Sequence, residues 1–134
     1  MNSLTGNIVQ LDVSGNLTLA HVKIMPHLIL QAIVIATPKT AAYLNTGQSV
    51  NVLFKETEVI VSTDSQSNIS LQNRIPASIA TIEGGQLLSR LNLISEAGKV
   101  NAIICTSAVK EMQLKAGTPV VAMVKLNEII LQAL

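Results

Sequence analysis

Two ten-residue stretches decide the fold: Asn2 to Leu11 reads NSLTGNIVQL, and Asn73 to Ile82 reads NRIPASIATI. In each stretch an asparagine comes first, and aliphatic residues follow at the third, seventh and tenth positions. Aliphatic residues match easily by chance in a chain that is 49% hydrophobic, so the shared asparagine carries much of the weight. Similarity at a fixed spacing indicates a duplicated unit, and we expect two similar halves in tandem.

The same order of matches continues to the end of both halves. The further pairs are Ala32-Ile33-Val34 with Ala102-Ile103-Ile104, Leu44 with Leu114, Gly47 with Gly117, Val50 with Val120, and Lys55 with Lys125. Between the halves, Ser62–Ser70 reads STDSQSNIS, a polar stretch without periodicity that is typical of a linker. We expect a first domain over residues 1–63, a linker over 64–69 and a second domain over 70–134.

Each half has the pattern of five short strands. The expected strands are short runs rich in β-branched residues and bounded by Gly, Pro or Asn: 7–13, 17–24, 29–36, 49–54 and 58–61, then 77–82, 87–94, 99–104, 119–124 and 128–133. Helix-forming residues predict a short helical turn at Thr40–Leu44 and another at Val109–Leu114. The expected fold is all-β, with two tandem five-stranded OB-like barrels, each with a short helical turn between strands 3 and 4. A sandwich of the same size is the alternative.

Several of these strands are apolar on both faces. Leu28–Ala36 and Val120–Val124 do not alternate between apolar and polar residues, as a strand with one wet face should. Charged residues make up only 13% of the chain, which is little to cover two small domains. We therefore expect the outer faces to contact the sister half or another subunit.

Composition excludes several classes of function. A net charge of +1 and only two aromatic residues, Tyr43 and Phe54, argue against direct binding of nucleic acid. The longest apolar segment, Leu28–Ala36, is too short to span a bilayer, and no secretory signal is recognisable. A single cysteine, Cys105, agrees with a reducing compartment, so we expect a cytoplasmic protein that does not act at a membrane.

No catalytic or metal-binding pattern stands out. The two histidines, His21 and His27, have no Cys, Asp or Glu at metal-ligand spacing, and surface histidines explain them better. No Ser/His/Asp set and no phosphate-binding glycine-rich loop is suggested. We expect neither a metal site nor enzymatic activity.

The motifs of both halves resemble a known family when they are taken in order. In the second half they are Ser70–Pro76 (SLQNRIP), residues 82–85 (IEGG), residues 114–117 (LKAG), and Val124-Lys125 followed by Ile129-Ile130-Leu131; the first half has Asn2–Gly6, residues 44–47 and Phe54–Val59. This order is similar to the molybdate-binding Mop domain, a TOBE-type domain. Its opening segment is Ser-x-Arg-Asn-x-apolar-x-Gly and its closing strand is Val-Ile-Lys-Ala-Ser-x-Val. The chain resembles the tandem two-copy form.

The resemblance implies a protein that binds a small oxyanion at interfaces between Mop units. The ligand would be molybdate or tungstate, with no cofactor, and the assembly a homotrimer, with a homodimer as the alternative. Molybdate is a dianion that only accepts hydrogen bonds, so its site must present N–H, hydroxyl and ammonium groups. An interface between barrels can offer such donors from two directions, whereas a small barrel interior is filled by side chains.

The candidate oxyanion-binding residues lie on the opening and closing motifs or beside the helical turn. They are Lys125, Lys55, Ser70, Gln72, Asn73, Thr57, Thr106 and Thr37. The two lysines recur at equivalent places inside apolar strands, where an unpaired ammonium is costly to bury. Alternative interpretations are a lysine that reaches water at a strand edge, and polar residues that serve only as linker or turn.

The chain departs from the family pattern at several donor positions. Gln72 replaces the arginine of the opening motif, and Ile35, Pro38, Cys105 and Ala108 replace the Thr and Ser that precede the helical turn. Fewer donors would weaken the sites, reduce their number, or leave a domain that serves assembly alone.

Three functions remain open from the sequence. The first is an intracellular molybdate-binding protein for storage and homeostasis. The second is the C-terminal sensing module of a molybdate-responsive transcriptional regulator or of the ATPase subunit of a molybdate importer. The third is an oligomerisation domain that has lost its ligand.

Overall fold

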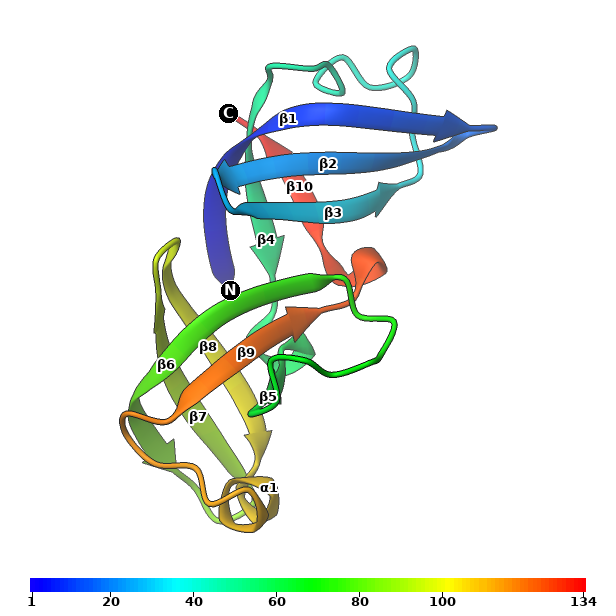
Figure 1. The fold of residues 1–134 in the computed structure, drawn as a ribbon. Helices are drawn as coiled ribbons and strands as arrows, with labels where there is room; N and C mark the ends of the chain where they lie inside the picture. Colours follow the sequence, from blue (N-terminus) through cyan, green and yellow to red (C-terminus); the bar gives the residue numbers. More distant parts are fainter.

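The computed structural model describes all 134 residues and contains ten strands, one α-helix and two 3-10 turns (Figure 1). The elements of the first half are β1 (Asn2–Ser14), β2 (Leu17–Met25), β3 (Leu28–Val34), β4 (Ser49–Phe54), η1 (Glu56–Glu58) and β5 (Ile60–Ser62). Those of the second half are β6 (Asn73–Gly84), β7 (Leu88–Ser95), β8 (Gly98–Cys105), α1 (Thr106–Glu111), β9 (Pro119–Val124), η2 (Leu126–Glu128) and β10 (Ile130–Ala133). No helix is long and apolar enough to cross a membrane.

The strands form two five-stranded antiparallel sheets, and each half gives its last strand to the other. The sheet orders are β10-β4-β1-β2-β3 and β5-β9-β6-β7-β8. Strand β10 pairs with β4 from Ile130↔Leu53 onward, and β5 pairs with β9 from Ile60↔Met123 onward. Figure 1 shows β10, from the end of the chain, lying beside β4 of the first half. The all-β, two-barrel expectation is confirmed, and the exchange of the fifth strand is a feature that the sequence did not indicate.

The long first strand of each half bends at the same place. A β-bulge interrupts the pairing of β1 with β2 between Ile8 and Gln10, and the pairing of β6 with β7 between Ile79 and Thr81. A bulge bends and twists its strand, which lets a small sheet curl toward a barrel. The two equivalent bulges show that the repeat in the sequence extends to the irregular parts of the fold.

The recurring glycines hold these bulges in place. Gly47 and Gly117 have φ values of 93° and 90°, a left-handed conformation that favours glycine. From this conformation the amide of Gly47 donates to the carbonyl of Ile8, and that of Gly117 to the carbonyl of Ile79, each at 2.7 Å. The glycines therefore recur because each connects the turn before the fourth strand to the bulge of the first.

One hydrophobic core extends through both halves. It contains 22 buried residues, among them Phe54 and Leu30 from the first half and Ile75 and Leu91 from the second. Along Asn2–Val9 buried and exposed residues alternate strictly, so one face of β1 points into this core. The exchanged strands make the two barrels pack as one body.

The helical segments between the third and fourth strands differ between the halves. In the second half α1 begins at Thr106, three residues before the expected start at Val109. The first half has turns there, in which one hydrogen bond has the α-helical spacing of four residues, from the amide of Ala41 to the carbonyl of Thr37 at 2.8 Å. Pro38 falls within this turn, and a proline is tolerated in the first turn of a helix because the amide there needs no partner.

Candidate anion-binding site

Lys55 and Lys125 occupy equivalent positions in the fold. Each directly follows the fourth strand of its half and precedes a 3-10 turn, with backbone angles of φ −74° and ψ 148° for Lys55 and φ −71° and ψ 148° for Lys125. Both side chains are exposed, and neither ammonium group forms an ion pair or a hydrogen bond within the chain. Each lysine is therefore a free cation.

Both lysines lie where the two halves meet. The turn η1 that follows Lys55 packs against β8, and the turn η2 that follows Lys125 packs against β3. Strands β8 and β3 are edge strands, and each belongs to the half opposite to the turn that it contacts. The two 3-10 turns thus cover the open edges of the neighbouring barrel, which places each lysine at the junction of the two units.

Asn73 and its counterpart Asn2 join the halves by the same interaction. The Asn73 carboxamide donates to the carbonyl of Gln31 at 2.8 Å and accepts from the amide of Gln31 at 2.7 Å. Asn2 makes the equivalent pair with the backbone of Asn101, at 2.9 and 2.8 Å. Both asparagines are buried, at 1% and 4% exposure. The Asn73 side chain therefore provides hydrogen-bond partners for the backbone of an edge strand in the other half.

Gln72 lies near Lys125, and Ser70 lies in the loop just before it. Asn73 pairs with Val124 in the antiparallel ladder, so the next step along the two strands sets Gln72 opposite Lys125. Both Gln72 and Ser70 are exposed. The pairing of Asn73 with Val124 thus places the opening motif of the second half beside its closing motif.

Arg74 orders the loop that carries Ser70. Its guanidinium donates to the carbonyl of Leu71 through Nε at 2.8 Å. Through Nη2 it donates to the carbonyls of Ser67, at 2.8 Å, and Ile69, at 3.1 Å. Hydrogen bonds from Arg74 therefore order part of the polar stretch between the halves.

Thr57 lies close to Lys55, whereas the other two threonines do not. Thr57 is the exposed middle residue of η1, two positions after Lys55. The hydroxyl of Thr106 bonds to Ser89 Oγ and to the carbonyl of Gly85, each at 2.8 Å, at the far end of its barrel. Thr37 occupies the equivalent end of the first barrel, where its hydroxyl accepts from the amide of Lys39 at 3.3 Å. At about 3.3 Å per strand residue, several residues of β8 or β3 separate these threonines from the junction.

Two charged residues beside Lys55 were not anticipated from the sequence. The Glu56 carboxylate lies 2.5 Å from the Met1 amino group, and its side chain is 19% exposed. The hydrogen bond from this amino group, with a weaker contribution from the charge of Arg90, lowers the pKa of Glu56. The equivalent of Glu56 in the second half is Leu126, so comparing the repeats position by position could have singled out this residue.

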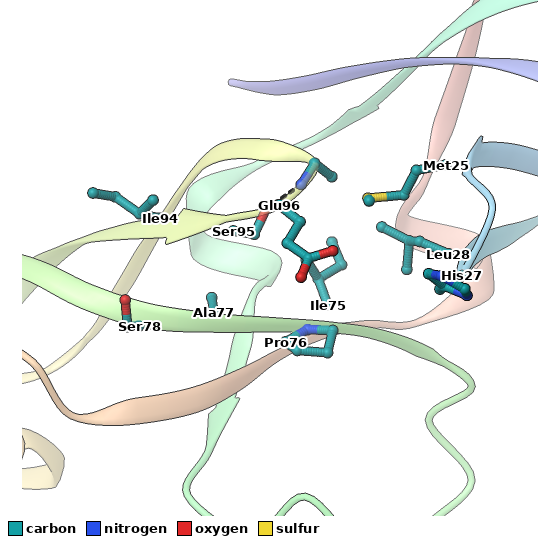
Figure 2. Close-up of a pocket in the computed structure, with 11 residues that line it drawn as sticks. Met25, His27, Leu28, Ile75, Pro76, Ala77, Ser78, Ile94, Ser95 and Glu96 are labelled. Atoms are coloured by element: carbon teal, nitrogen blue, oxygen red, sulfur yellow. Dashed lines mark hydrogen bonds between the residues drawn. The ribbon is translucent and has the colours of Figure 1, made fainter.

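A cavity between the two halves is separate from the lysines. It has a volume of about 600 Å³ and lies between the β2–β3 hairpin and the second half (Figure 2). Apolar side chains such as Met25, Leu28 and Ile75 line most of it, with His27 and Glu96 at its borders. None of the candidate anion-binding residues lines this cavity, and its apolar walls do not suit a dianion.

Comparison with known proteins agrees with the fold and the motifs. Residues 69–131 match the model of the TOBE domain. The chain superposes on a crystal structure described as the cytoplasmic molybdate-binding protein ModG with molybdate bound, with a TM-score of 0.91 and 24% sequence identity. The superposition covers 99% of this chain and 96% of that chain. No curated protein matches the sequence. The resemblance that the motifs indicated is thereby confirmed: residues 69–131 match the TOBE domain, and the whole chain shares the fold of that solved structure.

Proposed function

We propose that the chain is a cytoplasmic molybdate-binding protein that stores the anion and buffers its concentration, with tungstate as an alternative ligand. One observation carries the proposal: two equivalent lysines, each without a partner, lie at the junction of two units whose shared fold is that of a molybdate-binding protein. The protein binds and releases the anion without converting it.

The donors near each lysine suit a ligand that only accepts hydrogen bonds. We expect the Gln72 carboxamide and the Ser70 hydroxyl to act with Lys125, because they precede the strand that pairs with β9. We expect the Thr57 hydroxyl to act with Lys55, because it lies two positions further along the chain. Charge-assisted hydrogen bonds from such groups are the strong ones for a dianion. At the Lys125 site, where Leu126 rather than a carboxylate follows the lysine, protonated phosphate is also disfavoured, because its O–H group would be left unpaired. The arrangement therefore favours molybdate and tungstate over phosphate.

A single chain leaves each site incomplete, and self-association supplies the rest. Exposed apolar side chains gather at the barrel ends that carry Thr37 and Thr106: Ile35 is 78% exposed, and Leu87 is 80% exposed. Apolar surface of this kind marks a contact with another molecule. We propose a homotrimer, with a homodimer as the alternative, in which the threonine end of one chain meets the lysine region of another.

Calorimetric titration tests the proposal. Molybdate and tungstate are expected to bind the wild-type protein, sulfate weakly and phosphate more weakly still. Lys125→Ala and Lys55→Ala should each remove or weaken one class of site by about 2 kcal/mol or more, because a charged partner of the anion is lost. Lys23→Ala, at an exposed lysine of β2 that belongs to neither the lysine region nor the threonine end, is the matched control and should bind as the wild type does. Unchanged binding in both junction variants would refute the site.

A further inference from the structure

The two lysine sites differ in one charge. Residues 55–58 read KETE and residues 125–128 read KLNE, so the lysine and the last glutamate are shared. Glu56 in the first half corresponds to Leu126 in the second. A carboxylate therefore stands next to one lysine, and an aliphatic side chain stands next to the other.

The residues that face the two lysine sites across the junction also differ in charge. Arg90, which pairs with Glu83 in the β6–β7 ladder, is close enough to Glu56 for its charge to act on that carboxylate. The equivalent ladder pair in the first half is Leu19 with Asp12, so the counterpart of Arg90 is Leu19. The corner around Lys55 thus contains a carboxylate and additional cations, whereas in the other corner leucines take both of these places.

The Glu56 carboxylate forms an ion pair with a positive group beside Lys55. Asn2 pairs with Phe54 in the ladder, so Met1 lies opposite Lys55, and the Glu56 carboxylate binds the Met1 amino group at 2.5 Å. A carboxylate in this position offers the oxygen ligands that an incoming oxyanion would offer to the same positive groups. No acidic residue takes this position next to Lys125.

We propose that Glu56 is a resident anion that competes with the oxyanion at the Lys55 site, so that the two sites of one chain are unequal. The Lys125 site binds the anion more tightly and fills first, and the Lys55 site fills at higher concentration. This inference rests on the proposed function, because it ranks two sites that must both take the anion. Glu56 thus affects the affinity of the Lys55 site for the oxyanion although it makes no favourable contact with the oxyanion.

Each site can be measured alone by removing the lysine of the other. In a Lys125→Ala background, Glu56→Gln removes the competing charge while keeping the size of the side chain. A single negative charge close to a dianion in a solvent-exposed site is expected to change the dissociation constant by roughly fivefold to thirtyfold. Molybdate should therefore bind the double variant at least about fivefold more tightly than it binds Lys125→Ala alone in low-salt buffer, and the gain should shrink as salt is added.

The reciprocal exchange tests the second corner. In a Lys55→Ala background, Leu126→Glu should weaken molybdate binding by a similar factor, with circular dichroism to show that the variant is folded. Glu96→Gln, which removes an exposed carboxylate at the border of the cavity that is separate from the lysines, is the control for the change in net charge and should leave the affinity unchanged.

The outcomes separate this inference from the function on which it rests. A wild-type protein that binds no molybdate overturns both. Binding that depends on Lys55 and Lys125, but does not respond to Glu56→Gln, overturns the inference alone. A gain in Glu96→Gln equal to that in Glu56→Gln would show a general effect of net charge and would also overturn it.

Discussion

The Asn73 carboxamide pairs with both backbone groups of Gln31, which lies in the opposite half of the chain, at 2.8 and 2.7 Å. Gln31 lies in an edge strand, so the side chain takes the place of a neighbouring strand. Free edges invite pairing with other molecules, and here each edge is closed by an asparagine from the sister unit. The asparagines that revealed the repeat in the sequence therefore hold the repeats together.

Replacing Asn73 by alanine should lower the free energy of unfolding by about 2–3 kcal/mol. Two hydrogen bonds are lost, and the partly buried backbone groups of Gln31 are left without partners. Urea unfolding followed by circular dichroism measures the effect. Asn92→Ala, at a more exposed asparagine of β7, is the control and should cost less. A loss below about 0.5 kcal/mol in Asn73→Ala would contradict the assigned role.

Gly6→Ala should destabilise the protein by about 1–3 kcal/mol through overpacking. A Cβ at this position would lie 2.5 Å from the carbonyl oxygen of Lys23 and 2.8 Å from Ile24 Cδ1. Gly84→Ala is the matched control, because nothing lies within 4 Å of a Cβ there and its backbone is ordinary. Thermal unfolding of the two variants distinguishes the sites, and equal melting temperatures would show that the close packing at Gly6 is not as described.

Neither half should form a folded monomer alone. The sheet of the second half obtains its edge strand β5 from the first, and gives β10 in return. A fragment over residues 64–134 lacks β5, so it should either unfold or form a dimer in which the two copies exchange β10. Light scattering after gel filtration measures its mass. A folded, monomeric fragment would contradict the exchange of strands.

Asp12 should contribute to the dependence of stability on pH. The hydrogen bond from the Gln10 side chain, followed by that from His21, lowers the pKa of Asp12 below its usual 3.8. A lowered pKa means that the contribution to stability is complete above pH 3.8 and is lost as the pH falls through the lower value in the folded protein. Melting temperatures of wild type and Asp12→Asn between pH 2 and 6 check this. The difference between them should shrink on acidification, and a difference that stays constant would exclude the linkage.

Sequence reasoning predicted the all-β fold and most of the strands, but not the connections between the halves. Alternation along β1 and the glycines at 47 and 117 reflect local geometry, which a repeat displays directly. The exchange of β5 and β10 depends on which barrel has a free strand edge. The apolar periodicity of a short strand is the same whichever barrel it joins, so the sequence does not distinguish the two arrangements. The ion pair between Glu56 and the Met1 amino group likewise joins groups that are far apart in the sequence, so a local sequence pattern does not reveal it.

The sequence also did not predict where the two threonines lie relative to the lysines. Thr37 and Thr106 follow the third strand of each half, so they lie at the ends of the barrels remote from Lys55 and Lys125. Proximity in a family motif does not reveal whether donors meet within one chain or between chains. Their separation here is the reason that the proposed site needs a second copy.

Anomalous diffraction from crystals grown with tungstate tests the central claim most directly, because tungsten can be located without reference to the rest of the density. We expect peaks at chain interfaces within about 4 Å of the ammonium groups of Lys125 and, at higher concentration, Lys55, with a threonine of a neighbouring chain nearby. Tungsten found only elsewhere, for example in the cavity beside Met25 and Ile75, or a monomeric protein without ordered tungsten, would contradict the account.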